Sequence, residues 1–287
     1  MENNSFKDDI EIIFNSIKVA SIEIFDLLKG NMGEYTSTQN STGDTQLKVD
    51  VLSDEVVIKH FSKLSVVKQI CSEEQENAID ISQNGRYKIA YDPLDGSSLM
   101  GANLSVGSIF GIYDGDFLPE NIVASAYVVY GMVIGIGFVS NACDGVGYYV
   151  YDGKEFVYKK TLILNNSGKI NATGGTQKNW SKSHKDKIES LFNRGYRLRY
   201  SGGMVPDLHH ILVKGGGLFS YPATSDSPNG KLRMLFEVFP FAYIFDKAGG
   251  DSTNGKDSIL SLKPKHLHDT TPCFFGSKEE IEFVREK

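Results

Sequence analysis

The feature that most constrains the fold is a series of short β-rich runs between Ile89 and Lys159. In chain order the runs are YKIAY, VGSIFGIY, IVASAYVVY, VIGIGFV, GYYVY and EFVYKK. Short β-branched and aromatic runs separated by turn residues are typical of strands joined by hairpins. The sequence therefore predicts an antiparallel meander in this region.

One part of this region, residues 122–140, carries no charge and is long enough to span a bilayer. Its β-branched and aromatic content, its three glycines and its acidic flanks Glu120 and Asp144 do not fit a membrane helix. Two buried strands joined at the sequence YGM explain it better. We therefore expect no membrane association.

Two helices are predicted before the meander in the sequence. Residues 8–29 place Ile13, Ile17, Ala20 and Ile24 at helical spacing, and the polar stretch 30–46 is predicted to be a loop. A second helix is predicted to begin near Ser53 as its N-cap.

After about residue 160, strands and helices alternate, ending in a helix at SKEEIEFVREK. One long helix is predicted within residues 230–250. We therefore predict an α+β domain over residues 1–160 and an α/β domain over residues 161–287.

The composition narrows the possible binding partners of the chain and its cellular location. The 287 residues carry a formal net charge of −6, which argues against a nucleic-acid-binding protein because such proteins present a basic face. The three cysteines are odd in number and lack C-x-x-C spacing, and the N-terminal residues do not resemble a secretory signal. A cytoplasmic location is the expectation.

Acidic residues gather beside turns at four places along the chain. They are Asp50, the pair Glu73 and Glu74, the pair Asp92 and Asp95, and Glu237. Sets of oxygen ligands suit hard cations such as Mg²⁺ or Mn²⁺, whereas zinc would call for histidine and cysteine.

The stretch DPLDGSS indicates how metal and phosphate sites could lie side by side. Asp92 leaves a strand, and Pro93 fixes the backbone so that Asp95 can return toward the same point. Ser97 and Ser98 are then predicted to begin a helix whose N–H groups point at an anion. A plain turn followed by an N-cap is the alternative for these residues.

Several motifs together resemble class I fructose-1,6-bisphosphatase, in the Mg²⁺-dependent sugar and inositol phosphatase superfamily. They are SEE, DPLDGSS, SVGSIFGIY, RYSGGMVPDLHH and YPATSDSPNGKLRMLFEVFPFAYIFDKAGG, and the similarity runs from about residue 43 to residue 285. The resemblance implies a layered αβαβα sandwich and hydrolysis of the 1-phosphate of fructose 1,6-bisphosphate in gluconeogenesis.

The resemblance also implies roles for the acidic residues. Asp50 and Glu74 match the residues that position and deprotonate the attacking water. The residues that match metal ligands are Glu73, Glu74, Asp92, Asp95, Glu237 and, through its carbonyl, Leu94. The implied cofactor is Mg²⁺, with Mn²⁺ as a substitute, and most of the ligands fall in the predicted N-terminal domain.

Further positions match residues that bind the substrate. Gly96, Ser97 and Ser98 match the cradle of the departing phosphate, and the matches to the clamp on the retained phosphate are Asn171, Tyr200, Tyr221 and Lys231. Arg199 matches an arginine that reaches in from a neighbouring subunit, which implies a homotetramer. Arg233 is assigned to the polar face of the long helix. The first departure from the family pattern is Leu99, where the family usually has asparagine.

Three rival functions remain open from the sequence. A sedoheptulose-1,7-bisphosphatase, alone or as a second activity, would use the same clamp. A monophosphatase acting on inositol or a nucleotide phosphate would not need Lys231. An inactive regulatory homologue would keep the fold without releasing phosphate.

Overall fold

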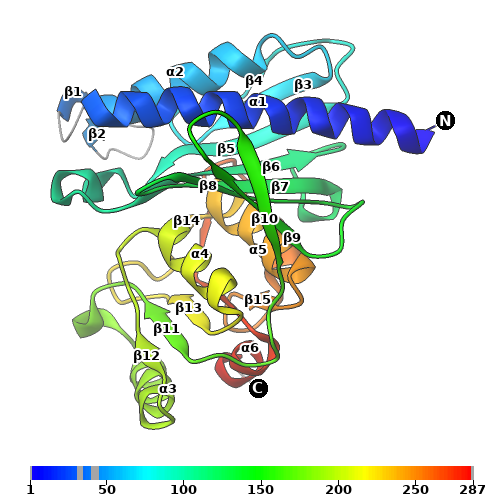
Figure 1. Cartoon of the computed structure of the whole chain (residues 1–287). Coiled ribbons are helices and arrows are strands. Elements are labelled where there is room, and N and C mark those ends of the chain that lie inside the picture. Colours follow the sequence, from blue (N-terminus) through cyan, green and yellow to red (C-terminus); the bar gives the residue numbers. More distant parts are fainter. Residues whose placement is uncertain (1, 31–34, 40–44, 286–287) are drawn as a thin grey trace.

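The structure is a computed structural model that describes residues 2–30, 35–39 and 45–285. Its elements form five layers: two N-terminal helices, an eight-stranded sheet, two buried helices, a five-stranded sheet, and two further helices (Figure 1). The predicted αβαβα sandwich is confirmed.

The first layer consists of α1 (Glu2–Gly30) and α2 (Lys48–Phe61). The predicted helical stripe is confirmed, because its four apolar side chains are fully buried. The predicted start of the second helix near Ser53 is wrong: α2 begins at Lys48, and Ser53 lies inside the helix and is fully buried. A residue on the packed face of a helix cannot also be its N-cap.

Part of the segment predicted as a loop forms a hairpin. Strands β1 (Tyr35–Gln39) and β2 (Thr45–Leu47) pair in antiparallel fashion. The loop prediction is therefore wrong for these residues, while residues 31–34 and 40–44 lie outside the described part of the chain. The hairpin forms through backbone pairing in a polar stretch, where no regular spacing of apolar residues indicates a strand.

The large sheet has the strand order β10-β9-β8-β7-β6-β5-β3-β4. Its strands are β3 (Val67–Ser72), β4 (Ile79–Asp80), β5 (Tyr87–Asp95), β6 (Val106–Tyr113), β7 (Ile122–Tyr130), β8 (Ile134–Ser140), β9 (Val146–Tyr151) and β10 (Phe156–Leu162). From β5 to β10 all pairings are antiparallel, which confirms the meander. The unpredicted β3 joins β5 in parallel.

The uncharged segment of the meander forms β7 and β8 of this sheet. Among the described residues, no helix is long and apolar enough to cross a membrane.

The remaining elements build the lower layers. They are β11 (Ile170–Thr173), α3 (Lys182–Asn193), β12 (Arg197–Leu198), α4 (Met204–Lys214), β13 (Leu218–Tyr221), β14 (Leu232–Arg233), α5 (Phe239–Lys247), β15 (Asp251–Thr253), β16 (Thr270–Thr271), β17 (Cys273–Gly276) and α6 (Lys278–Val284). The second sheet has the order β12-β11-β13-β17-β15, while β14 pairs with β16. The predicted alternation of strands and helices is confirmed.

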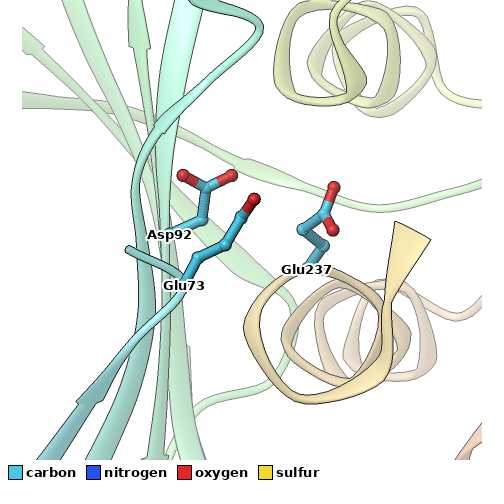
Figure 2. A group of neighbouring side chains, drawn as sticks. All are labelled: Glu73, Asp92 and Glu237. Atoms are coloured by element: carbon cyan, nitrogen blue, oxygen red, sulfur yellow. The ribbon is translucent and has the colours of Figure 1, made fainter. Parts of the chain in front are cut away.

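The long helix predicted within residues 230–250 is shorter than expected. Strand β14 comes first, one π-helical turn spans Met234–Val238, and only then does α5 begin. The π turn places Glu237 on the side that faces the large sheet (Figure 2).

The main core lies between the two sheets, around α4 and α5. Tyr127 of the large sheet, Phe241 of α5 and Phe275 of the small sheet belong to one buried cluster. A second cluster holds α1 and α2 against the outer face of the large sheet. Because α4 and α5 pack on both sheets, their N-terminal ends are fixed beside the end of β5.

Candidate active site

Three carboxylates from separate elements meet at one point between the large sheet and the π turn. Glu73 directly follows β3, Asp92 lies in the neighbouring strand β5, and Glu237 comes from the π turn (Figure 2). One oxygen of each side chain lies within 4.8 Å of the others. Parallel pairing of β3 with β5 places the first two side by side.

Burial makes these negative charges costly. Asp92 and Glu237 are 4% and 5% exposed, and loss of hydration raises the pKa of both carboxyl groups well above the usual range. The charge of Glu73 is the next cause for both pKa shifts. Such a cluster is stable only when protons or cations offset the repulsion.

Arg233 supplies part of this compensation. Its guanidinium forms an ion pair with Glu73, and its backbone N–H donates to Glu237 Oε2 at 2.6 Å. The assignment of Arg233 to the polar face of a helix is therefore wrong. Arg233 is the last residue of β14, directly before the π turn, and its side chain reaches the carboxylates from there.

The three carboxylates fit a divalent metal ion. Glu73 Oε2 is buried without a hydrogen-bond partner, and every donor in the group is an oxygen. Within residues 2–30, 35–39 and 45–285, no other group of three metal-ligating side chains comes this close together. Hard cations prefer such donors.

Asp95 does not belong to the group of three carboxylates and instead contacts helix α4. Its carboxylate accepts N–H bonds from Val205 at 2.7 Å and Met204 at 3.4 Å, in the first turn of α4. Burial raises its pKa to about 7, although these two amides act in the opposite direction. Asp95 thus joins the end of β5 to the N-terminus of α4 and lies outside the 4.8 Å group.

Gly96 follows with a backbone conformation that favours glycine. Its φ is +77°, and a Cβ there would lie 3.3 Å from the Cα of Gly203. The helix predicted at Ser97 is a six-residue 3₁₀ helix, Ser97–Ala102, without a side-chain cap. It ends where the backbone turns left-handed again at Asn103.

The carboxylates form one wall of a cleft with a volume of about 310 Å³, which we call the acid cleft. Sequence-predicted residues that line it are Asp50, Glu73, Glu74, Asp92, Leu94, Asp95, Gly96, Ser97, Ser98, Tyr200, Tyr221, Lys231 and Glu237. Asp50, in the first turn of α2, accepts a hydrogen bond from Ser97 Oγ at 3.3 Å.

Three other lining residues of the acid cleft carry hydrogen-bond donors. Lys231 is exposed, and the Tyr200 hydroxyl and the Tyr221 ring lie next to each other beside Gly174. Partial burial raises the pKa of Tyr200 to about 12 and also raises that of Tyr221. Both phenols are therefore protonated at neutral pH and can donate to an anion.

Two predicted substrate residues do not line the acid cleft. Asn171 is fully buried in β11, on the same face as Thr173, whose hydroxyl lies 3.4 Å from His184 of α3. That face points away from the core between the sheets, where Ala172 packs. Arg199 is exposed beside a different pocket. The structure gives no support to a phosphate contact by Asn171 within the same chain.

Other residues of the acid cleft were not predicted from the sequence. They are Gly202, Gly203, Met204, Phe219, Leu232 and Arg233. The glycine pair begins two residues after Tyr200, and Leu232 and Arg233 follow Lys231, so closeness in the sequence to predicted residues was the available signal.

Comparisons with known proteins agree with this geometry. Residues 2–162 match the family model for the fructose-1-6-bisphosphatase N-terminal domain, and residues 164–287 match that for the C-terminal domain. A class 1 fructose-1,6-bisphosphatase of Helicobacter hepaticus is 53% identical over 282 residues, covering 96% of this chain and 99% of the relative. One of Campylobacter concisus is 52% identical over 279 residues, with 96% and 97% covered.

Solved structures show the same arrangement. Leishmania major fructose-1,6-bisphosphatase in its holo form superposes with a TM-score of 0.89 at 30% identity, covering 96% of this chain and 93% of the other. A proposed sedoheptulose-1,7-bisphosphatase of Toxoplasma gondii gives a TM-score of 0.87 at 29% identity, with 96% and 92% covered. The predicted family is confirmed: this chain belongs to the class I fructose-1,6-bisphosphatases, a family of phosphatases that use a divalent metal.

Proposed function

We propose that this protein hydrolyses the 1-phosphate of fructose 1,6-bisphosphate, giving fructose 6-phosphate and phosphate, with Mg²⁺ as its metal and in the service of gluconeogenesis. The observation that carries the proposal is one cleft lined both by a group of carboxylates, its acidic end, and by the donors Lys231, Tyr200 and Tyr221, its cationic end. A bisphosphate needs both ends, because one phosphate reacts while the other is held.

The acidic end would hold the metal. We assign the ligands as the side chains of Glu73, Glu74, Asp92, Asp95 and Glu237 and the backbone carbonyl of Leu94. When bound, divalent metal neutralises charge on the phosphoryl oxygens and acidifies water. Asp95 can take part while it holds α4, since each carboxylate oxygen has a second lone pair.

Asp50 and Glu74 would orient the attacking water and accept its proton. Both line the acid cleft, and the hydroxyl of Ser97 holds the Asp50 carboxylate in place at 3.3 Å. A general base within hydrogen-bond reach of the water contributes about 10²- to 10⁴-fold to such a reaction. The Gly96–Ser98 segment lies next to this pair and would hold the departing phosphate.

The retained phosphate would lie at the cationic end. Lys231 offers a charge and up to three donors, and the two protonated phenols offer one donor each. The exposed position of Arg199, outside its own cleft, is consistent with a contact to a neighbouring subunit in a homotetramer. Light scattering tests the assembly, and mixing Arg199→Ala subunits with inactive Asp92→Asn subunits tests the shared site.

Two further proposals concern the domain boundary and the cellular location. We infer a boundary between the two domains near residue 160, supported by the end of the large sheet at Leu162 and the start of the second at Ile170. A cytoplasmic location is supported by the three cysteines, each of which carries no disulfide.

The rivals separate in a phosphate-release assay with Mg²⁺ on three substrates. Fructose 1,6-bisphosphate should give the highest kcat/KM, sedoheptulose 1,7-bisphosphate a lower one, and inositol phosphate none. A preference for the seven-carbon sugar would overturn the proposed substrate, and the Toxoplasma neighbour makes that comparison necessary. Release from no substrate would favour an inactive regulatory homologue.

A further inference from the structure

A second pocket, which shares no lining residue with the acid cleft, is lined by residues of β11, β12 and the C-terminal end of α4. Its volume is about 540 Å³. The cationic side chains that line it are Lys169, Arg197, Arg199 and Lys214, and we call it the basic pocket. None of the described residues that line it is an aspartate or glutamate. The chain as a whole carries a net charge of −6, so this cluster runs against the overall charge.

The cations of the basic pocket lack acidic partners within the described chain. None of the four forms an ion pair with a described aspartate or glutamate. His210 lies among them, and burial together with the charges of Lys214 and Arg199 lowers its pKa. The carboxylate behind the pocket, Glu280, is buried; its Oε1 accepts from the Tyr196 hydroxyl and the Gly168 N–H, its Oε2 has no hydrogen-bond partner, and it forms no ion pair with the four cations.

The backbone that frames the basic pocket is fixed in position. The Gly168 N–H donates to Glu280 Oε1 at 2.7 Å, and the side chain of Asn165 donates to the Gly215 carbonyl at 2.8 Å. The Arg197 N–H donates to the Lys169 carbonyl at 2.8 Å. Gly168 packs so closely on Gly216 that an added Cβ would lie 2.0 Å from its carbonyl carbon. The frame is therefore formed before any ligand arrives, which lowers the entropic cost of binding.

We propose that the basic pocket binds a small anion with at least two negative charges, such as a phosphate-bearing metabolite. Like charges gathered at one place repel each other, and a multivalent anion removes that repulsion while forming charge-assisted hydrogen bonds. Arginine matches phosphate geometry with paired donors, and lysine adds charge from a flexible stem. The site rests on Lys169, Arg197 and Lys214 and does not depend on Arg199, which we have proposed to contact a neighbouring subunit.

The basic pocket is connected to the acid cleft through a short piece of chain. Arg197 lines the pocket, while Tyr200, three residues later, lines the acid cleft. An anion held by Arg197 restricts this segment and with it the backbone that carries Tyr200. The pocket is thus placed to let a second anion act on substrate binding, which goes beyond the proposed hydrolysis.

Calorimetric titration of the metal-free protein with inorganic pyrophosphate tests the site. We expect the charge-removing variant Arg197→Gln/Lys214→Gln to lose at least about tenfold in the affinity of one class of site. The charge-retaining variant Arg197→Lys/Lys214→Arg should keep most of that affinity, and Lys154→Gln, an exposed lysine on the β9–β10 hairpin, should match the wild type. Isotherms that coincide for the wild type and the charge-removing variant would overturn the proposal.

Hydrogen exchange of residues 196–200 tests the connection. Pyrophosphate should slow exchange in the wild type and in Lys231→Gln, whose acid cleft is impaired, and should not do so in Arg197→Gln/Lys214→Gln. Protection that disappears in Lys231→Gln would instead place the anion in the acid cleft and contradict the proposal. Both measurements are independent of turnover, so an inactive wild type would count against the proposed function alone.

Discussion

Two groups of residues in the acid cleft differ in how they carry charge: the carboxylates, which we call its buried end, and the donors Lys231, Tyr200 and Tyr221, which we call its exposed end. At one end, Asp92 and Glu237 are almost completely buried, and their charges must be offset by protons, Arg233 or a metal. At the other end, Lys231 is exposed and Tyr200 is 43% exposed, so their donors remain hydrated without a partner. Substitutions of the buried carboxylates should therefore impair both the reaction and stability. Substitutions of the exposed donors can change substrate preference with little loss of stability.

The largest effect is expected from the buried end. Asp92→Asn removes a charged ligand from the group of three and should lower kcat by about 10³-fold or more, since metal stabilisation of the transition state amounts to several kcal/mol. Phosphate release at saturating Mg²⁺ measures it. Asp144→Asn, an exposed acid near β9, serves as the control and should keep full activity. An active Asp92→Asn enzyme would separate the carboxylate cluster from the reaction.

Removal of Arg233 tests the charge compensation without a metal. Arg233→Met should lower the free energy of unfolding of the metal-free protein by about 3 kcal/mol, because it leaves Glu73 without its partner in a buried site. Mg²⁺ should restore most of this loss. The matched control is Arg86→Met, which breaks an exposed pair with Asp114 and should cost less than about 1 kcal/mol. Equal losses in both variants, measured by urea denaturation, would contradict the comparison.

At the exposed end, Lys231→Ala should affect binding more than turnover. A hydrogen bond to a charged group contributes about 1.5–3 kcal/mol, so KM for fructose 1,6-bisphosphate should rise roughly 10- to 100-fold with a smaller change in kcat. Lys154→Ala provides the control for a lost surface charge. An unchanged KM in Lys231→Ala would favour a monophosphatase.

The smallest effect concerns the pH dependence of Asp95 in the metal-free protein. Its pKa is about 7 in the folded state against an ordinary value of 3.8, so the folded state holds the proton more tightly than the unfolded state. Stability is therefore lost as the pH rises from about 4 to about 7. The wild type should lose roughly 1 kcal/mol or more relative to Asp95→Asn over this range. Parallel stability curves for the two proteins would show that the carboxyl titrates normally.

The part of the site that the sequence predicts well is formed by local structure. The stretch DPLDGSS contains its own strand end, its turn and a glycine with positive φ, so its residues reach the acid cleft as expected. The meander is equally local, because each strand pairs with the next along the chain.

The parts that the sequence missed depend on contacts between distant segments. Asp95 accepts an N–H bond from Val205 in the first turn of α4, and the two residues are 110 positions apart in the sequence. Arg233 reaches Glu73 from the end of strand β14, where the sequence predicted a helix. Asn171 matches a family position, but strand alternation in β11 turns its side chain to the face on which α3 packs. Periodicity within one segment carries no information on such pairings.

The most direct test of the account is a titration of the chelator-stripped enzyme with Mg²⁺ while phosphate release from fructose 1,6-bisphosphate is followed. The account predicts no release without metal and a saturable recovery with Mg²⁺ that is abolished in Asp92→Asn. Release at the full rate in the stripped enzyme would contradict the claim that the buried carboxylates act through a divalent metal.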